Sequence, residues 1–150
     1  MKNALKNIYL EEDIAKKYLK QIEKYKLMID AKCNQLKELE KYSNLIGCNN
    51  ISSSYSNSNK ITSKTENIAS KRTDLKMYIE DEIHKYTLLK NNIIDDIYNT
   101  NDNRYINILL TKYVEIKSLE ETSVKLGYSY EYTRHLHLRA LRKVYDVIKK

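Results

Sequence analysis

Within twelve positions, 118–129, the residue types mark two helix starts and one helix end. Ser118 is a candidate N-cap, and Glu121 follows at the spacing of a capping box, in which each side chain satisfies a backbone N–H. Gly127 is one of only two glycines in the chain, and it stands where a helix ends at positive φ. Ser129 can cap the next helix. The sequence therefore predicts a short helix, a tight turn and a second helix.

Both predicted helices have one inward face. On the short helix this face comprises Leu119, Thr122, Ser123 and Leu126. On the second it follows steps of one, three or four and comprises Thr133, Leu136, Ala140, Leu141, Val144 and Ile148. The stretch 130–150 also carries six Lys or Arg against two acids. A capped helix, a glycine turn and a longer basic helix form the helix-turn-helix plan, whose second helix enters the DNA major groove. We call residues 118–150 the helix-turn-helix segment.

This segment resembles region four of bacterial sigma factors, which reads the −35 promoter element. The residues that carry the resemblance are Leu119-Glu-Glu, Leu126-Gly, Ser129, Arg134 and Ala140-Leu-Arg-Lys, and 105–113 resembles the preceding helix. Over nearly the whole chain, two amphipathic helices around a Ser/Asn-rich linker and a Gly-Tyr-Ser-Tyr helix-turn-helix are similar to phage late-gene transcriptional regulators of the ArpU and RinA type. That resemblance implies an activator of phage or prophage late genes that binds double-stranded promoter DNA and acts with bacterial RNA polymerase. The expected location is the cytoplasm, in association with the nucleoid.

The resemblance to sigma region four also assigns site residues. Its base-reading positions align with the exposed early residues of the second helix, namely Tyr130, Glu131, Tyr132, Arg134 and His135. Glu131 can accept a hydrogen bond from cytosine N4, and Arg134 can pair with guanine. Later residues are expected at phosphates, and the two N-cap serines belong to the same DNA-binding set: Arg139, Arg142, Lys143, Ser118 and Ser129. Tyrosines stand at 130 and 132 where sigma factors often have arginine, so a −35-like sequence preference is not implied.

The first two thirds of the chain predict two long helices, because the chain has no proline and only two glycines to interrupt them. One runs over 1–46 and the other resumes between 61 and 67 and continues to Ile97, each with an amphipathic stripe. Gly47 is expected to end the first helix, and the Ser/Asn-rich stretch at about 47–60 to be a linker. The stripes can pair as an antiparallel hairpin within one chain or as a coiled coil between chains, giving a homo-oligomer.

The expected architecture is thus all-α. Residues 1–101 form a two-helix coiled-coil region, and residues 102–150 form a helix-turn-helix module that begins with a helix capped by Asp102. The net charge of +7 favours a polyanionic partner without choosing one. Cys33 and Cys48 are too few and too far apart for a disulfide framework, which fits a reducing cytosol. No apolar run approaches the ~18 residues of a membrane span, so no membrane partner is expected.

Nothing in the sequence predicts an enzyme, a cofactor or a metal site. His135 and His137 stand two apart on a helix and do not share a face, so they are a poor metal pair. With His84, they are predicted to be polar surface or DNA-facing residues. The alternative from another functional class is a small terminase-like DNA-packaging or coiled-coil assembly protein. Such a subunit would form rings and bind a large ATPase, whereas an activator would approach RNA polymerase.

Overall fold

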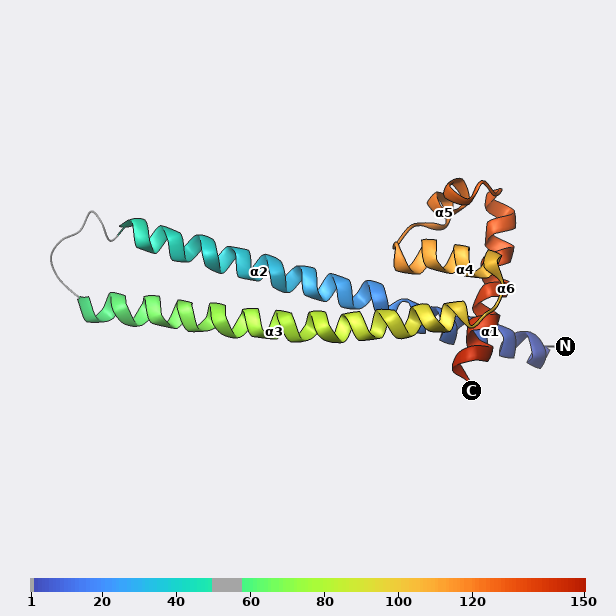
Figure 1. The fold of residues 1–150 in the computed structure, drawn as a ribbon, viewed down its shortest axis with the longest axis horizontal. Coiled ribbons are helices and arrows are strands. Elements are labelled where there is room, and N and C mark those ends of the chain that lie inside the picture. The colour runs from blue at the N-terminus through green and yellow to red at the C-terminus, as the bar shows by residue number, and fades with distance from the viewer. Residues whose placement is uncertain (1, 50–57) are drawn as a thin grey trace. The chain divides into compact units, whose positions relative to one another are not determined.

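The structure of this protein is a computed structural model that describes residues 2–49 and 58–150. These residues form helices and connecting turns without a strand (Figure 1). In chain order the elements are α1 (Lys2–Leu19), α2 (Gln21–Asn49), α3 (Ser58–Tyr98), α4 (Asn103–Leu109), the π-helix η1 (Leu110–Val114), α5 (Leu119–Leu126) and α6 (Tyr130–Ile148). The all-α class predicted from the sequence is therefore confirmed.

The single helix predicted over 1–46 is divided into α1 and α2, and α2 ends later than predicted. It is interrupted at Lys20, although backbone hydrogen bonds of 3.0 Å from Lys20 N–H to the Lys16 carbonyl and 3.1 Å from Lys24 N–H to the Lys20 carbonyl continue past the break. It also does not end at Gly47, because α2 runs on to Asn49. A glycine inside a helix costs only about 1 kcal/mol relative to alanine, which neighbouring residues can offset.

The second long helix begins earlier than predicted. It starts at Ser58 rather than between 61 and 67. Of the linker expected at about 47–60, residues 50–57 lie outside the described part of the chain.

The chain folds into two compact units. Unit 2 comprises residues 26–85, and unit 1 comprises residues 1–25 together with 86–150. The boundary expected between 101 and 102 therefore lies inside unit 1. Its location differs because α1 packs against α6, which joins the first helix of the chain to the last.

In unit 2, α2 and α3 run antiparallel, side by side (Figure 1). The Lys32 ammonium lies 5.6 Å from the ring centroid of Tyr78, and further along, the Glu40 carboxylate lies 3.6 Å from the Arg72 guanidinium. Residue numbers rise on one helix as they fall on the other, which is the register of a hairpin. Of the two pairings that the sequence left open, the hairpin within one chain is therefore formed in unit 2.

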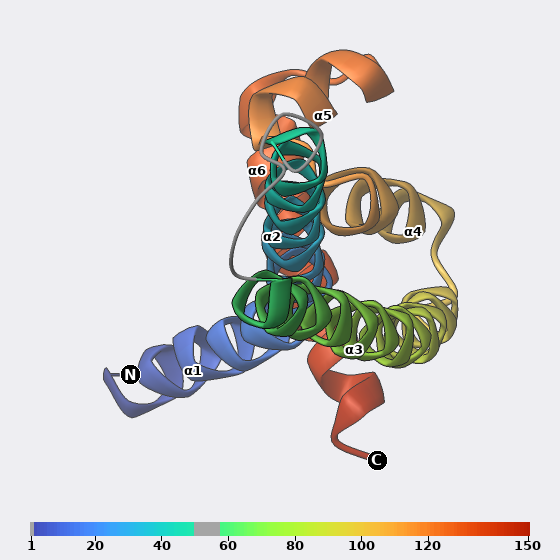
Figure 2. The same cartoon turned by 90° about the vertical axis from the view of Figure 1, so that its left-hand side faces the viewer.

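Unit 1 has a core made from both ends of the chain. Its buried residues are Ala15, Leu19, Ile22, Ile93, Ile97, Ile106, Ile108, Leu109, Tyr113, Leu136, Ala140, Leu141 and Val144. Helix α6 contacts α1, α4 and α5, and Figure 2 shows α1 and α4 extending to opposite sides. Burying one large aliphatic side chain contributes about 1.5–3 kcal/mol, so α1 is an integral layer of this unit.

The helix predicted over 105–113 is divided. Regular α-helical bonding ends at Leu109, and η1 then makes a wider turn in which Glu115 N–H donates to the Leu110 carbonyl at 3.0 Å. The following link contains Ile116 at φ 58°. A β-branched residue rarely adopts positive φ, because its Cβ substituents crowd the backbone there. Packing on both sides of this link must therefore hold Ile116 in place.

Candidate nucleic-acid interface

The capping predicted at the start of α5 is confirmed. The Ser118 hydroxyl accepts a hydrogen bond from the Glu121 N–H at 3.1 Å, and the Glu121 carboxylate accepts one from the Ser118 N–H at 2.7 Å. The Ser118 backbone N–H, as the main cause, holds the pKa of Glu121 below its usual value. These reciprocal bonds fix where α5 begins.

The turn predicted after α5 is also confirmed. Gly127 has φ 69° and ψ 29°, the left-handed conformation, and the next N–H, of Tyr128, donates to the Ser123 carbonyl at 3.0 Å. Ser129 then caps α6, because its hydroxyl accepts from the Tyr132 N–H at 3.3 Å. The hydroxyls of Ser118 and Ser129, both assigned to DNA binding from the sequence, are thus engaged in capping.

The two inward faces pack as predicted. The Thr122 and Ser123 hydroxyls donate to backbone carbonyls of the preceding turn, each at 2.7 Å, so both side chains are buried with satisfied hydrogen bonds. On α6 the buried residues are Thr133, Leu136, His137, Ala140, Leu141 and Val144, whereas Ile148, predicted on the same stripe, is only partly buried. Val124, on the opposite side of α5, is 81% exposed. With one face of α6 held against the core, its other face is free to meet a ligand.

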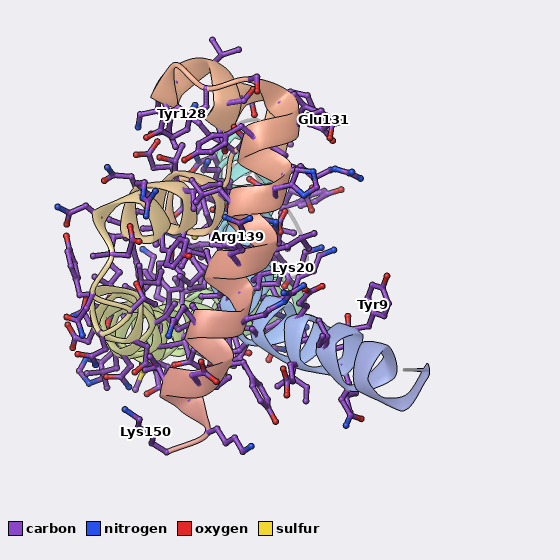
Figure 3. The ribbon with its side chains drawn as sticks, turned by 90° about the vertical axis from the view of Figure 1, so that its right-hand side faces the viewer. Tyr9, Lys20, Tyr128, Glu131, Arg139 and Lys150 are labelled. Carbon is purple, nitrogen blue, oxygen red and sulfur yellow. The ribbon has the colours of Figure 1, made fainter. Side chains whose placement is uncertain are left out.

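The five residues predicted to read bases are all exposed. They are Tyr130, Glu131, Tyr132, Arg134 and His135. Figure 3 shows Glu131 at the end of α6 next to the turn, with Tyr128 across that turn. The Glu131 carboxylate lies 3.4 Å from Arg134 and 3.9 Å from His135, and the Tyr128 and Tyr132 rings meet edge to face at 5.1 Å. Exposed ion pairs contribute little, so Arg134 can leave Glu131 for a better acceptor.

A further basic side chain lies beside this face, and sequence reasoning missed it. Arg104, on α4, is held by Asp102, whose carboxylate accepts from its guanidinium at 3.0 Å. Asp102 raises the pKa of Arg104 most, and Tyr132 on α6 raises it further. Helix α4 packs against α6. The sequence signalled the Asp102 cap, but it carried no sign that α4 and the start of α6 would meet.

The three residues assigned to phosphates have different surroundings. Arg139 is exposed and has no ion-pair partner within the described residues, and the Lys143 ammonium lies 4.0 Å from the Asp146 carboxylate. The Arg142 guanidinium instead donates to the carboxylate of Glu12 on α1 at 2.7 Å. The Glu12 side chain is only 9% exposed. Arg142 therefore links α6 to α1, a role that the sequence did not suggest.

His137 is not the surface or DNA-facing residue that the sequence predicted. It is buried, its Nε2 lies 2.9 Å from the Tyr113 hydroxyl, and the two rings stack at 5.7 Å. Burial, and then the charges of Lys112 and Lys16, lower the pKa of His137 to about 4. Its neighbours explain the error, because Thr133 and Leu141 stand four residues before and after it on the same stripe. His135 and His84 are exposed as predicted.

The buried neutral His137 predicts an acid-sensitive unit 1. Its folded pKa of about 4 lies below the ordinary 6.5, so the unfolded chain binds the extra proton between those values. The associated stability is complete above pH 6.5 and falls by about 3 kcal/mol as the pH drops through 4. His137→Gln should flatten this part of the urea-unfolding profile between pH 7 and 4. The exposed control His135→Gln should keep the parent's slope, and equal slopes for both variants would contradict the assignment.

Within the described residues, no helix is long and apolar enough to cross a membrane. The same residues contain no cluster of three His, Cys, Asp or Glu side chains that could hold a metal ion. Comparison with protein-family models, with curated proteins and with solved structures finds no match to this chain.

Proposed function

We propose that this protein is a sequence-specific DNA-binding transcriptional regulator whose helix α6 enters the major groove. One observation carries the proposal. The capped α5, the left-handed Gly127 and the capped α6 form a helix-turn-helix in which every residue expected to read bases is exposed. The exposed residues at the start of α6 include donors and acceptors suited to base edges, and exposed Arg139 and Lys143 further along suit phosphates.

The resemblance to sigma region four and to regulators of the ArpU and RinA type supports a more specific role. We infer an activator of phage or prophage late genes that binds a promoter and acts with bacterial RNA polymerase. Unit 2 supplies a surface for the protein partner or for a second copy of the chain. Its exposed apolar side chains include Leu27, Tyr42, Leu45 and Met77, which are 60–64% exposed.

Substitutions of two arginines on α6 test the proposal, because they should impair DNA binding in different ways. Arg134→Ala should weaken binding to the preferred site by about 1–3 kcal/mol and relax base choice at one position. Arg139→Ala should weaken all sequences about equally and reduce the slope of log K against log[salt] by about one unit. The preferred site is first selected from fragments of the source genome. Fluorescence anisotropy on that duplex and on a scrambled one, at several salt concentrations, then measures both effects.

The same measurements can overturn the proposal. A parent protein without sequence preference, or two variants that bind both duplexes as the parent does, would contradict DNA reading by α6. The packaging or assembly alternative would then become the better explanation. Light scattering after size exclusion would test it, because a packaging subunit forms rings, and a large ATPase should be captured with it.

A further inference from the structure

A solvent-open groove of about 410 Å³ lies in unit 1, and the helix-turn-helix face just described does not use it. Its lining includes Lys16 from α1, Lys20 from the break between α1 and α2, Lys112 from η1, and His137 and Leu138 from α6. These ammonium groups come from segments almost a hundred residues apart in sequence, and the fold brings them to one groove. Figure 3 shows Lys20 at the side of α6 from which α1 projects, the side on which Glu131 also lies.

The lysines of this groove are not neutralised by its acids. Lys16 and Lys20 have no ion-pair partner within the described residues, and the Lys112 ammonium donates to the Lys117 carbonyl at 3.3 Å. The two acids in the lining are engaged elsewhere, since the carboxylates of Asp13 and Glu12 lie 2.8 Å from Lys17 and 2.7 Å from Arg142, respectively. The groove therefore has a surplus of positive charge.

The positive charge of the groove affects the pKa of Lys112, which is lowered. Burial is the main cause that lowers its pKa, and the charges of Lys20 and Lys16 lower it further, while the nearby Glu120 and Glu23 act in the opposite direction. A bound anion would relieve the repulsion among the ammonium groups. The apolar part of the lining would strengthen the attraction by excluding water from one side. A compact anion with several acceptor oxygens would therefore suit this groove.

From this geometry we infer that the groove binds a backbone phosphate of DNA, next to the base pairs that α6 reads. The inference rests on the proposed function and extends it to α1. The groove borders α6 along Leu138 and Leu141 and reaches Leu119, the first residue of α5, so a duplex lying on α6 would pass its opening. Lysine suits such a contact, because its compact charge needs no fixed hydrogen-bond geometry.

The test compares two double variants with the same change in net charge. Lys16→Gln/Lys20→Gln removes two groove lysines spaced i, i+4, and Lys37→Gln/Lys41→Gln removes two exposed lysines at the same spacing on α2 in unit 2. The groove variant should lower the salt slope of specific binding by about one unit, at ~0.9 per phosphate. Between 50 and 200 mM salt it should thus lose about three- to fourfold less affinity than the control. Thermal melts check that both variants are folded.

Three other outcomes overturn the inference, and each is distinguishable. If the parent binds its preferred site and the two variants have equal slopes, the groove does not contact DNA although the proposed function stands. If slopes are equal while inorganic phosphate raises the melting temperature of the parent and the control, and not of the groove variant, the groove takes a free phosphate. If the parent binds no duplex, the proposed function fails and this inference fails with it.

Discussion

Replacing Gly127 with valine should abolish specific DNA binding while the helices of unit 2 persist. An added Cβ would meet nothing within 4 Å, so the expected defect comes from the backbone alone. At φ 69° a residue other than glycine costs about 1–3 kcal/mol, and a β-branched one is the least tolerated. Relaxation of this strain would turn α6 relative to α5 and misplace the base-reading face. Anisotropy with the preferred duplex measures the loss, and far-UV circular dichroism follows the helices.

Gly127→Asn is the matched control for that prediction. Asparagine enters the left-handed region far more readily than valine, and the open space around Gly127 accommodates its side chain. It should therefore retain most of the parent's affinity and stability. Equal DNA affinity in the valine variant and the parent would show that the conformation of this turn does not position α6.

Removing Arg142 should destabilise unit 1 more than it weakens DNA contacts. The Glu12 carboxylate, 9% exposed, would lose the guanidinium that lies 2.7 Å away. Breaking a fully buried ion pair costs about 3–5 kcal/mol, and because the Arg142 side chain is 45% exposed we expect about 2 kcal/mol for Arg142→Ala. Urea unfolding measures the loss. Without urea, where the variant is still folded, Arg142→Ala should have the same salt slope of DNA binding as the parent. Arg139→Ala should have a smaller slope.

A double variant distinguishes the ion pair from general damage. Glu12→Gln/Arg142→Ala removes the unpaired carboxylate, so it should be more stable than Arg142→Ala alone, with a coupling of about 1–2 kcal/mol between the sites. Additive losses would mean that Glu12 and Arg142 act independently. A reduced salt slope for Arg142→Ala would instead restore the phosphate role that the sequence assigned to it.

Local signals allowed the helix-turn-helix segment to be predicted from sequence. A cap, a left-handed glycine and a helical stripe each depend on residues a few positions apart. Ser118, Gly127 and Ser129 therefore adopt their expected conformations. The burial of His137 had such a signal too, because the stripe at Thr133 and Leu141 includes its position. Its residue type outweighed its spacing in the prediction, although a histidine can be buried neutral when it has a hydrogen-bond partner.

Features that depend on distant residues were not predictable in this way. The pairing of Glu12 with Arg142 spans 130 positions, and no spacing rule connects them. The first apolar stripe was assigned to a partner helix of similar length, yet Ala15 and Leu19 belong to a core shared with α6. The π-turn of η1 and the positive φ of Ile116 also have no sequence signature, since surrounding packing imposes them.

The distribution of unit 1 between the two chain ends has a consequence for its synthesis. The buried residues of α1 leave the ribosome well before their partners on α6 are made. At ~5–20 residues per second, the roughly 125 residues after Tyr25 take about 6–25 s. During this interval the apolar side of α1 lacks its final partner and is exposed to chaperones and proteases. Nascent chains, and chains truncated before α6, consequently lack the finished fold of unit 1.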